Sequence, residues 1–439
     1  MKRMILSLTL GLSVLSFISA MGQEQDEAQQ KTSSPFSQYQ FVPDISLILD
    51  MSGVYRTLGN DTYQKLAMRG FTGGNLNDFN KNVGFNLNYG ELGIHEPVDP
   101  YFELTGIFTF TMDGVEIEEA FINTTSIPGG FGIKAGKFKS SFGRLNAQHE
   151  HVWDFHDSPI VYRTMFGSDG LNEVGAQVTW VAPIDTYLLI GAEALQGENE
   201  ESFGAKGFHD PTFVYRIGGN QGPNAYTGFV KSSIDSGNWS VLYGLSTACG
   251  WTRSLEDLTT VGIDNMDYET ALLGNIARGI RGTTCIGGAD LTIKYLINSY
   301  QYVSLQGEYL YRSTIGNYYY TVANAASGSM ITYRLPYDKQ VSGMYAQVIV
   351  KPFQLWRFGA RFELLHLDLY RLAGNRVNDP RTLIKASGMV DLHLTEFSLF
   401  RLQYNHDRTG YDRYRNQRVN NEVILQVNIA IGSHGAHPF

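Results

Sequence analysis

Apolar and polar residues alternate along this chain, segment after segment, from residue 41 onward. Such a period of two residues predicts β-strands, because successive side chains of a strand point to opposite faces of its sheet. The segments run for roughly 10 to 14 residues, whereas strands of soluble proteins average about 5 to 6 and a tilted membrane-crossing strand needs about 9 to 11. In the last segment, one face holds Val423, Leu425, Val427, Ile429 and Ile431, and the other holds Glu422, Ile424, Gln426, Asn428 and Ala430.

Short and long connections between these segments also alternate. The short ones are 128–130, 183–185, 236–238, 298–301, 352–353 and 395–396, and the long ones are 144–171, 200–223, 253–283, 319–339, 368–382 and 409–420. Outer-membrane barrels have tight periplasmic turns at one end and long external loops at the other. A soluble β-sandwich alternates as well, but it gives no reason for this asymmetry. We therefore predict an all-β fold, a transmembrane antiparallel up-and-down barrel of about 16 strands.

The first residues resemble a secretory signal. Lys2 and Arg3 precede an apolar core, and small residues follow it, so we predict a signal peptide at 1–22. A short polar segment, 23–40, leads into the predicted barrel at 41–439, which includes a lumen loop at 144–171. The polar segment is too short for the plug of an energy-coupled transporter. The terminal aromatic Phe439 resembles the ending that the barrel-assembly machinery recognises in outer-membrane proteins.

Charged residues fall on the face of the strands that is predicted to line the lumen. A barrel of about 16 strands is too wide for its side chains to fill, so a water-filled lumen is expected. We predict passive diffusion of small hydrophilic solutes or ions, lipid around the barrel, and a homotrimer as one assembly. The charges would set up a transverse field or would simply be solvated. The predicted pore-lining residues are Arg357, Arg361, Lys385, Arg401, Glu193, Asp290, Glu308 and Glu363.

The stretch "HEHVWDFHD" in loop 144–171 raises the question of a metal site. His149, His151, Asp154 and His156 carry donors that suit zinc, and zinc is the one cofactor we consider. The alternative is a constriction loop held to the wall by hydrogen bonds; its residues would be Arg144, His149, His151, Trp153, Asp154, His156 and Asp157.

Enzymatic chemistry is not expected. Glu150 lies between two histidines, unlike the glutamate of a helical H-E-x-x-H hydrolase. "NHDR" at 405–408 lacks a recognisable serine partner. The formal net charge of −9 disfavours nucleic acid, whose phosphates need basic patches. Cys249 and Cys285 flank one long loop, so a disulfide at its base is one reading and two free thiols are the other.

Two motifs carry a family resemblance. "FGRLNAQHEHVWDFHDSPIVYRTMFGSDGLNEVGAQVTW" and "LQVNIAIGSHGAHPF" resemble a Gram-negative outer-membrane group of porin-like barrels, some of them labelled zinc-regulated outer-membrane receptors. The phosphate-selective porins are more distantly similar. The resemblance implies a location in the outer membrane of a Gram-negative bacterium and passage of small solutes. It also implies an alternative function, a zinc-linked binding or uptake receptor without a plug domain.

Overall fold

The computed structural model describes residues 43–66, 68, 80–199, 201–204, 219, 222–254, 278–323, 330–376, 381–412 and 416–432. The predicted signal peptide at 1–22, the polar segment 23–40 and Phe439 lie outside the described residues. In the described part of the chain, no helix combines the length and the apolar character needed to cross a bilayer.

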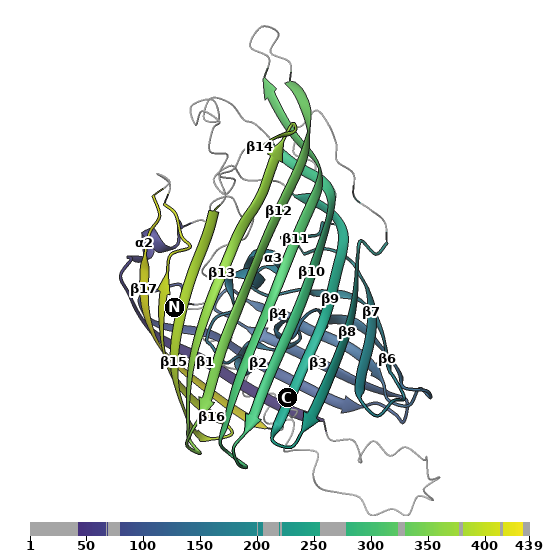
Figure 1. The fold of residues 1–439 in the computed structure, drawn as a ribbon, viewed down its shortest axis with the longest axis vertical. Coiled ribbons are helices and arrows are strands. Elements are labelled where there is room, and N and C mark those ends of the chain that lie inside the picture. Colours follow the sequence, from purple (N-terminus) through teal and green to yellow (C-terminus); the bar gives the residue numbers. More distant parts are fainter. Residues whose placement is uncertain are drawn as a thin grey trace, which may run out of the picture. The chain divides into compact units, whose positions relative to one another are not determined.

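The described residues form one antiparallel barrel (Figure 1). Its sheet has seventeen strands, of which β14 has only two residues and pairs with β13 alone. The barrel closes because β1 pairs with β17 over eleven residue pairs. The prediction of an up-and-down barrel of about 16 strands is confirmed.

The strands are β1 (Asp44–Arg56), β2 (Gly84–Pro97), β3 (Phe102–Phe110), β4 (Val115–Thr124), β5 (Phe131–Lys139), β6 (Asn172–Val181), β7 (Tyr187–Leu195), β8 (Ala225–Ser236), β9 (Trp239–Ser254), β10 (Arg278–Leu296), β11 (Tyr302–Ala323), β12 (Met330–Lys351), β13 (Trp356–Leu372), β14 (Asn375–Arg376), β15 (Arg381–Thr395), β16 (Ser398–Asp407) and β17 (Asn420–Gly432). The helices are α2 (Asn60–Tyr63), η2 (Leu145–Ala147), η3 (Glu150–Val152) and α3 (Ile160–Phe166).

The alternation in the sequence separates the two faces of the wall. On β17, Leu425 points outward and is 52% exposed, whereas the next residue, Gln426, is 3% exposed and points into the lumen. Gln426 Nε2 donates to the Asp50 carboxylate at 2.6 Å, which continues the polar lining from β17 to β1. Apolar side chains cover the outer face and polar groups find partners inside, as a membrane barrel requires.

Four strands are longer than the alternation had indicated. β10, β11, β12 and β13 have 19, 22, 22 and 17 residues, and the β11–β12 hairpin extends beyond its neighbours (Figure 1). Residues 278–283, 319–323, 330–339 and 368–372 were predicted to be external loop, and this was wrong. Apolar and aromatic packing extends these strands, in a buried cluster of Ile280, Tyr318, Tyr337, Tyr370 and Leu372.

Two further features lie near the long connections. Cys249 on β9 is in register with Cys285 on β10, and a disulfide joins them. β5 ends at Lys139 rather than at the predicted 143, because the chain turns inward there. Gly143 has a φ of +60°, a conformation that glycine adopts readily, and a Cβ at this position would clash with Glu308 and Tyr162.

Placing a charged residue on the outer face of β17 tests the assignment of that face to lipid. We expect Leu425→Arg, in the middle of β17, to lower the free energy of unfolding by about 2–4 kcal/mol. The matched variant Ile431→Arg lies on the same face near the strand end, where the expected loss is about 0–1 kcal/mol. Denaturant titration of protein refolded into vesicles measures both. Equal losses, or a larger loss at Ile431, would contradict the predicted dependence on depth.

Candidate functional site

The connection between β5 and β6 folds into the barrel. It spans residues 140–171, four residues more than the predicted lumen loop 144–171, and from here on lumen loop means 140–171. It contains η2, η3 and α3, and α3 packs against β12 and β13. Apolar side chains explain this position, because they would otherwise face water. Phe142, Ile160 and Met165 are fully buried, in one cluster with the wall residues Leu310 and Leu365. The loop thus fills part of the interior that the wall side chains cannot reach.

One wall carboxylate holds the first turn of the lumen loop. Glu308 on β11 accepts hydrogen bonds from the backbone N–H groups of Arg144 (3.0 Å) and Leu145 (2.9 Å). It also accepts from the hydroxyls of Tyr162 and Tyr345, each at 2.6 Å. A buried carboxylate that accepts four hydrogen bonds is well compensated for its lost hydration. Glu308 is therefore an anchor of the loop.

The middle of the loop is fastened by ion pairs to β13 and β15. Asp154 contacts Arg357 at 3.0 Å. Asp157 contacts Arg361 at 2.9 Å and also pairs with Lys385. We call these five residues the carboxylate clamp. Burial alone would raise the pKa of the Asp157 carboxyl, but Lys385 and Arg361 outweigh this effect and hold that pKa well below its usual range.

The other predicted pore-lining residues also have partners in the wall or in the loop. Arg401 donates to both oxygens of Asp391, at 2.8 and 3.1 Å, and to the Trp153 carbonyl at 3.1 Å. Glu363 pairs with Arg361 at 2.9 Å and accepts the Ile160 N–H at 2.6 Å.

On the wall of β6 to β11, two of the predicted carboxylates, Glu193 and Glu308, accept hydrogen bonds from the start of the lumen loop. Glu193 accepts from Ser140 Oγ and from the Ser141 N–H. Asp290 lies opposite Glu308 in the β10–β11 register. Most of the predicted pore-lining residues thus bind the lumen loop directly.

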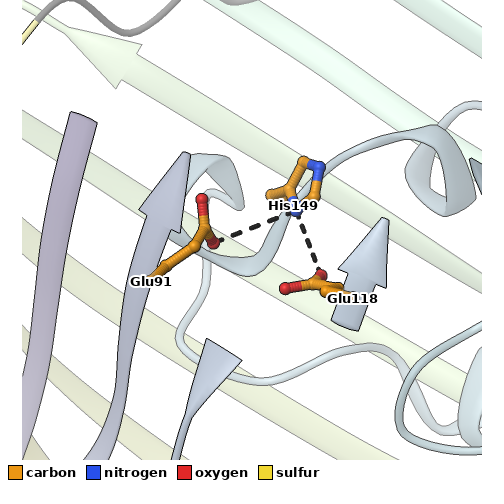
Figure 2. A group of neighbouring side chains, drawn as sticks. All are labelled: Glu91, Glu118 and His149. Carbon is orange, nitrogen blue, oxygen red and sulfur yellow. Dashed lines mark hydrogen bonds and ion pairs between the residues drawn. The ribbon is translucent and has the colours of Figure 1, made fainter. Parts of the chain in front are cut away.

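An acidic cluster on β2 and β4, which we call the acidic pocket, contacts two histidines of the loop, His149 and His151, the first of which is drawn in Figure 2. His149 Nδ1 lies 3.1 Å from Glu118 and 3.9 Å from Glu91, and its Nε2 lies 2.8 Å from Glu119. His151 Nδ1 lies 3.3 Å from Glu91. Burial alone would lower the pKa of His149, but its hydrogen bonds to Glu118 and Glu119 outweigh this and raise the pKa to about 10.

Both Glu118 and Glu119 face the lumen because β4 contains a bulge. Ile107 on β3 pairs with Glu119, but the next residue, Phe108, pairs with Ile117, so Glu118 is extra. A bulge of this kind re-aims one side chain to the other face. The sequence reading missed Glu91, Glu118 and Glu119. The signal that could have revealed two of them is the pair of adjacent acids in a strand that otherwise alternates.

The four residues predicted to bind zinc are not brought together. His149 and His151 lie at the acidic pocket, whereas Asp154 is in the carboxylate clamp. His156 Nε2 lies 3.2 Å from Asn80 Oδ1, and the backbone N–H of His156 donates to Gln403 Oε1 on β16. The reason is that the segment crosses the lumen between residues 151 and 154. A different group, Glu91, Glu118 and His149, offers ligand atoms within 4.8 Å of one another.

Cavities lie on both sides of the lumen loop. The cavity toward the short turns has a volume of ≈ 450 Å³ and is lined by Arg144, Lys294, Arg357, Arg401 and Glu396 among others. On the side of the long connections, a cavity of ≈ 30 Å³ is lined by residues that include Asp157 and Lys385. The carboxylate clamp thus lines the larger cavity with one carboxylate and the smaller with the other.

Known structures share the fold. The outer-membrane channel DcaP of Acinetobacter baumannii has a TM-score of 0.51 at 11% identity, covering 90% of this chain and 99% of its own. A loop-deletion mutant of OmpT, an outer membrane protein of Vibrio cholerae, has a TM-score of 0.50 at 10% identity, covering 89% of this chain and 99% of its own. At such identities the likeness concerns the fold alone.

Sequence comparison gives one close relationship. No protein-family model matches the chain. An uncharacterized protein of Aquifex aeolicus (strain VF5) is 42% identical over 410 residues, which cover 92% of this chain and 82% of that protein. The chain therefore belongs to the same family as this Aquifex aeolicus protein, and its fold is the porin-like barrel of the outer membrane.

Proposed function

We propose that this protein is a porin-like channel for passive diffusion of small hydrophilic solutes across the outer membrane of a Gram-negative bacterium. The observation that carries the proposal is a closed barrel with a polar inner wall that holds an internal loop. Barrels of this strand number enclose an aqueous interior. The lumen loop narrows that interior and sets the size of solute that passes.

The carboxylate clamp is the proposed control point of the channel. Asp154 and Arg357 line the cavity of ≈ 450 Å³, and Asp157 and Lys385 line the cavity of ≈ 30 Å³ beyond it. A solute that moves between the two cavities passes along the segment 154–157. Movement of this segment away from β13 and β15 would widen the route, because ion pairs rather than backbone pairing hold it there.

The proposed partners follow from the outer surface. Outward apolar side chains would contact lipid, and the barrel-assembly machinery would insert the chain. We also propose a homotrimer, with the apolar hollow of ≈ 470 Å³ on the outside of β3 to β5, lined by Phe102, Ile122 and Ile133, as its candidate contact surface. We propose no catalytic role. His406 Nδ1, in the "NHDR" stretch, lies 2.8 Å from Asn421 Oδ1 on the neighbouring strand.

Planar-bilayer recording tests the channel proposal. Refolded full-length protein should produce discrete conductance steps that scale with salt concentration, because ions would cross a hydrated lumen. Detergent-matched blanks are the control. A correctly folded protein that gives no steps over a wide range of salt would contradict the proposal.

Weakening the carboxylate clamp should enlarge the channel. Asp157→Asn removes the negative charge that pairs with Arg361 and Lys385, so we expect a higher single-channel conductance or a larger open fraction. Asp185→Asn, in an exposed turn between β6 and β7, is the matched control and should behave as wild type. If the two variants conduct alike, the clamp does not control passage.

Removing the Glu308 carboxylate should make the lumen loop more mobile while the strands of the barrel stay paired. Glu308→Ala leaves four donors unpaired, at about 1–3 kcal/mol for each that stays buried. Hydrogen–deuterium exchange should therefore rise in peptides from 142–166, whereas peptides from β16 and β17 stay protected. Glu116→Ala, at an exposed position of β4, provides the comparison. Unchanged exchange in 142–166 would rule out the anchoring role.

A further inference from the structure

We propose that Glu91, Glu118 and His149 form a binding site for one divalent transition-metal ion, with Zn²⁺ the best fit, which fastens the lumen loop to β2 and β4. Metal binding by these residues stands on its own geometry. Its effect on passage through the barrel rests on the proposed channel function.

The three ligand atoms come from separate parts of the chain and converge. Glu91 Oε2 lies 3.9 Å from His149 Nδ1, and Glu118 Oε1 lies 3.1 Å from the same nitrogen. All three atoms lie within 4.8 Å of one another, so an ion between them needs only small movements of side chains (Figure 2). One imidazole nitrogen and two carboxylate oxygens are a donor set that zinc accepts, and three protein ligands leave a position for water.

Two neighbours are placed as orienting groups rather than as ligands. Glu119 Oε2 lies 2.8 Å from His149 Nε2, the nitrogen that faces away from the proposed ion. Metal-binding histidines usually donate their other ring N–H to a carboxylate in this way, which fixes the tautomer and the ring orientation. His151 Nδ1 lies 3.3 Å from Glu91 Oε2 and positions that carboxylate. The bulge at Glu118 is what brings both acids of β4 to the same histidine.

The local charge also favours a cation. Glu91, Glu118 and Glu119 surround His149, and their side chains are 7%, 15% and 8% exposed. Lys139 supplies one permanent positive charge, with its Nζ 3.1 Å from Glu118 Oε1. Carboxylates that are withdrawn from water need compensation by positive charge. A divalent ion that replaces the proton on His149 Nδ1 would supply it, in competition with Lys139 for Glu118.

The position of this site gives the ion a mechanical role. In the closed sheet, β4 lies roughly across the barrel from β13 and β15, which carry the clamp. Bound metal would therefore hold residue 149 to one side of the lumen while the carboxylate clamp holds 154–157 to the other. The segment between them would be fixed across the channel.

Isothermal titration of Zn²⁺ into tag-free, refolded full-length protein in detergent tests the site. Wild type should bind about one ion at this site. His149→Ala and the double variant Glu91→Gln/Glu118→Gln should lose this binding. Glu119→Gln, which changes only the orienting group, should weaken it roughly 10- to 100-fold. His366→Ala is the matched histidine control on β13, where His366 pairs with Thr382, and it should bind as wild type.

A variant that should increase Zn²⁺ affinity distinguishes loss of the site from misfolding, because a misfolded protein would not bind Zn²⁺ more tightly. Lys139→Gln removes the competing cation, so it should raise the affinity for Zn²⁺. Circular dichroism and heat-modified gel mobility check that each barrel is folded. Wild-type binding that persists unchanged in folded His149→Ala would overturn the proposal, as would the absence of Zn²⁺ binding in wild type.

Bilayer recording with and without Zn²⁺ separates this inference from the channel proposal. Zn²⁺ should lower conductance in wild type but not in His149→Ala. Conductance steps that Zn²⁺ leaves unchanged would overturn the regulatory role alone. Titration heat at this site without any conductance step would support the metal site and contradict the channel.

Discussion

The barrel depends on one constraint, which is that every backbone N–H and C=O within lipid must be paired inside the protein. An open sheet leaves two unpaired edges, and eleven residue pairs between β1 and β17 remove them here. Closure of the sheet determines which side of each strand faces outward and which faces the lumen. Because the sheet is a ring, each strand has one face toward lipid and one toward an enclosed lumen, and any polar group on the inner face must meet water or another part of the chain.

Many polar groups of the inner wall meet the lumen loop rather than water. Glu308 binds the start of the loop, Glu118 and Glu119 bind His149, and Arg361 and Arg357 pair with the two aspartates. Anionic and cationic stretches of the wall thus meet loop residues of opposite charge. Ion pairs of this kind contribute little to stability when they are buried, but they specify geometry, since a misplaced partner leaves an uncompensated charge. The wall charges therefore determine where the loop crosses the lumen.

The sequence predicted the wall and the presence of a lumen loop, but not which residues the loop contacts, for a physical reason. A period of two is local, so Leu425 and Gln426 could be assigned to faces without any long-range information. The loop obeys no period, and its contacts join residues far apart in the sequence, by 30 positions for His149 with Glu119 and by 203 for Asp154 with Arg357. The "HEHVWDFHD" stretch was recognised as polar chemistry, but its close spacing wrongly suggested one site. In space the stretch reaches two sides of the lumen.

The most informative departure from the regular pattern is the bulge in β4. A strict alternation would place Glu118 against lipid, where a charged side chain is strongly unfavourable. The bulge turns it inward and sets it beside Glu119, so both meet one imidazole. Irregularities in an otherwise consistent fold tend to mark functional positions. Two adjacent acids in an alternating membrane strand therefore point to a local bulge and to a cation on the inner side of it.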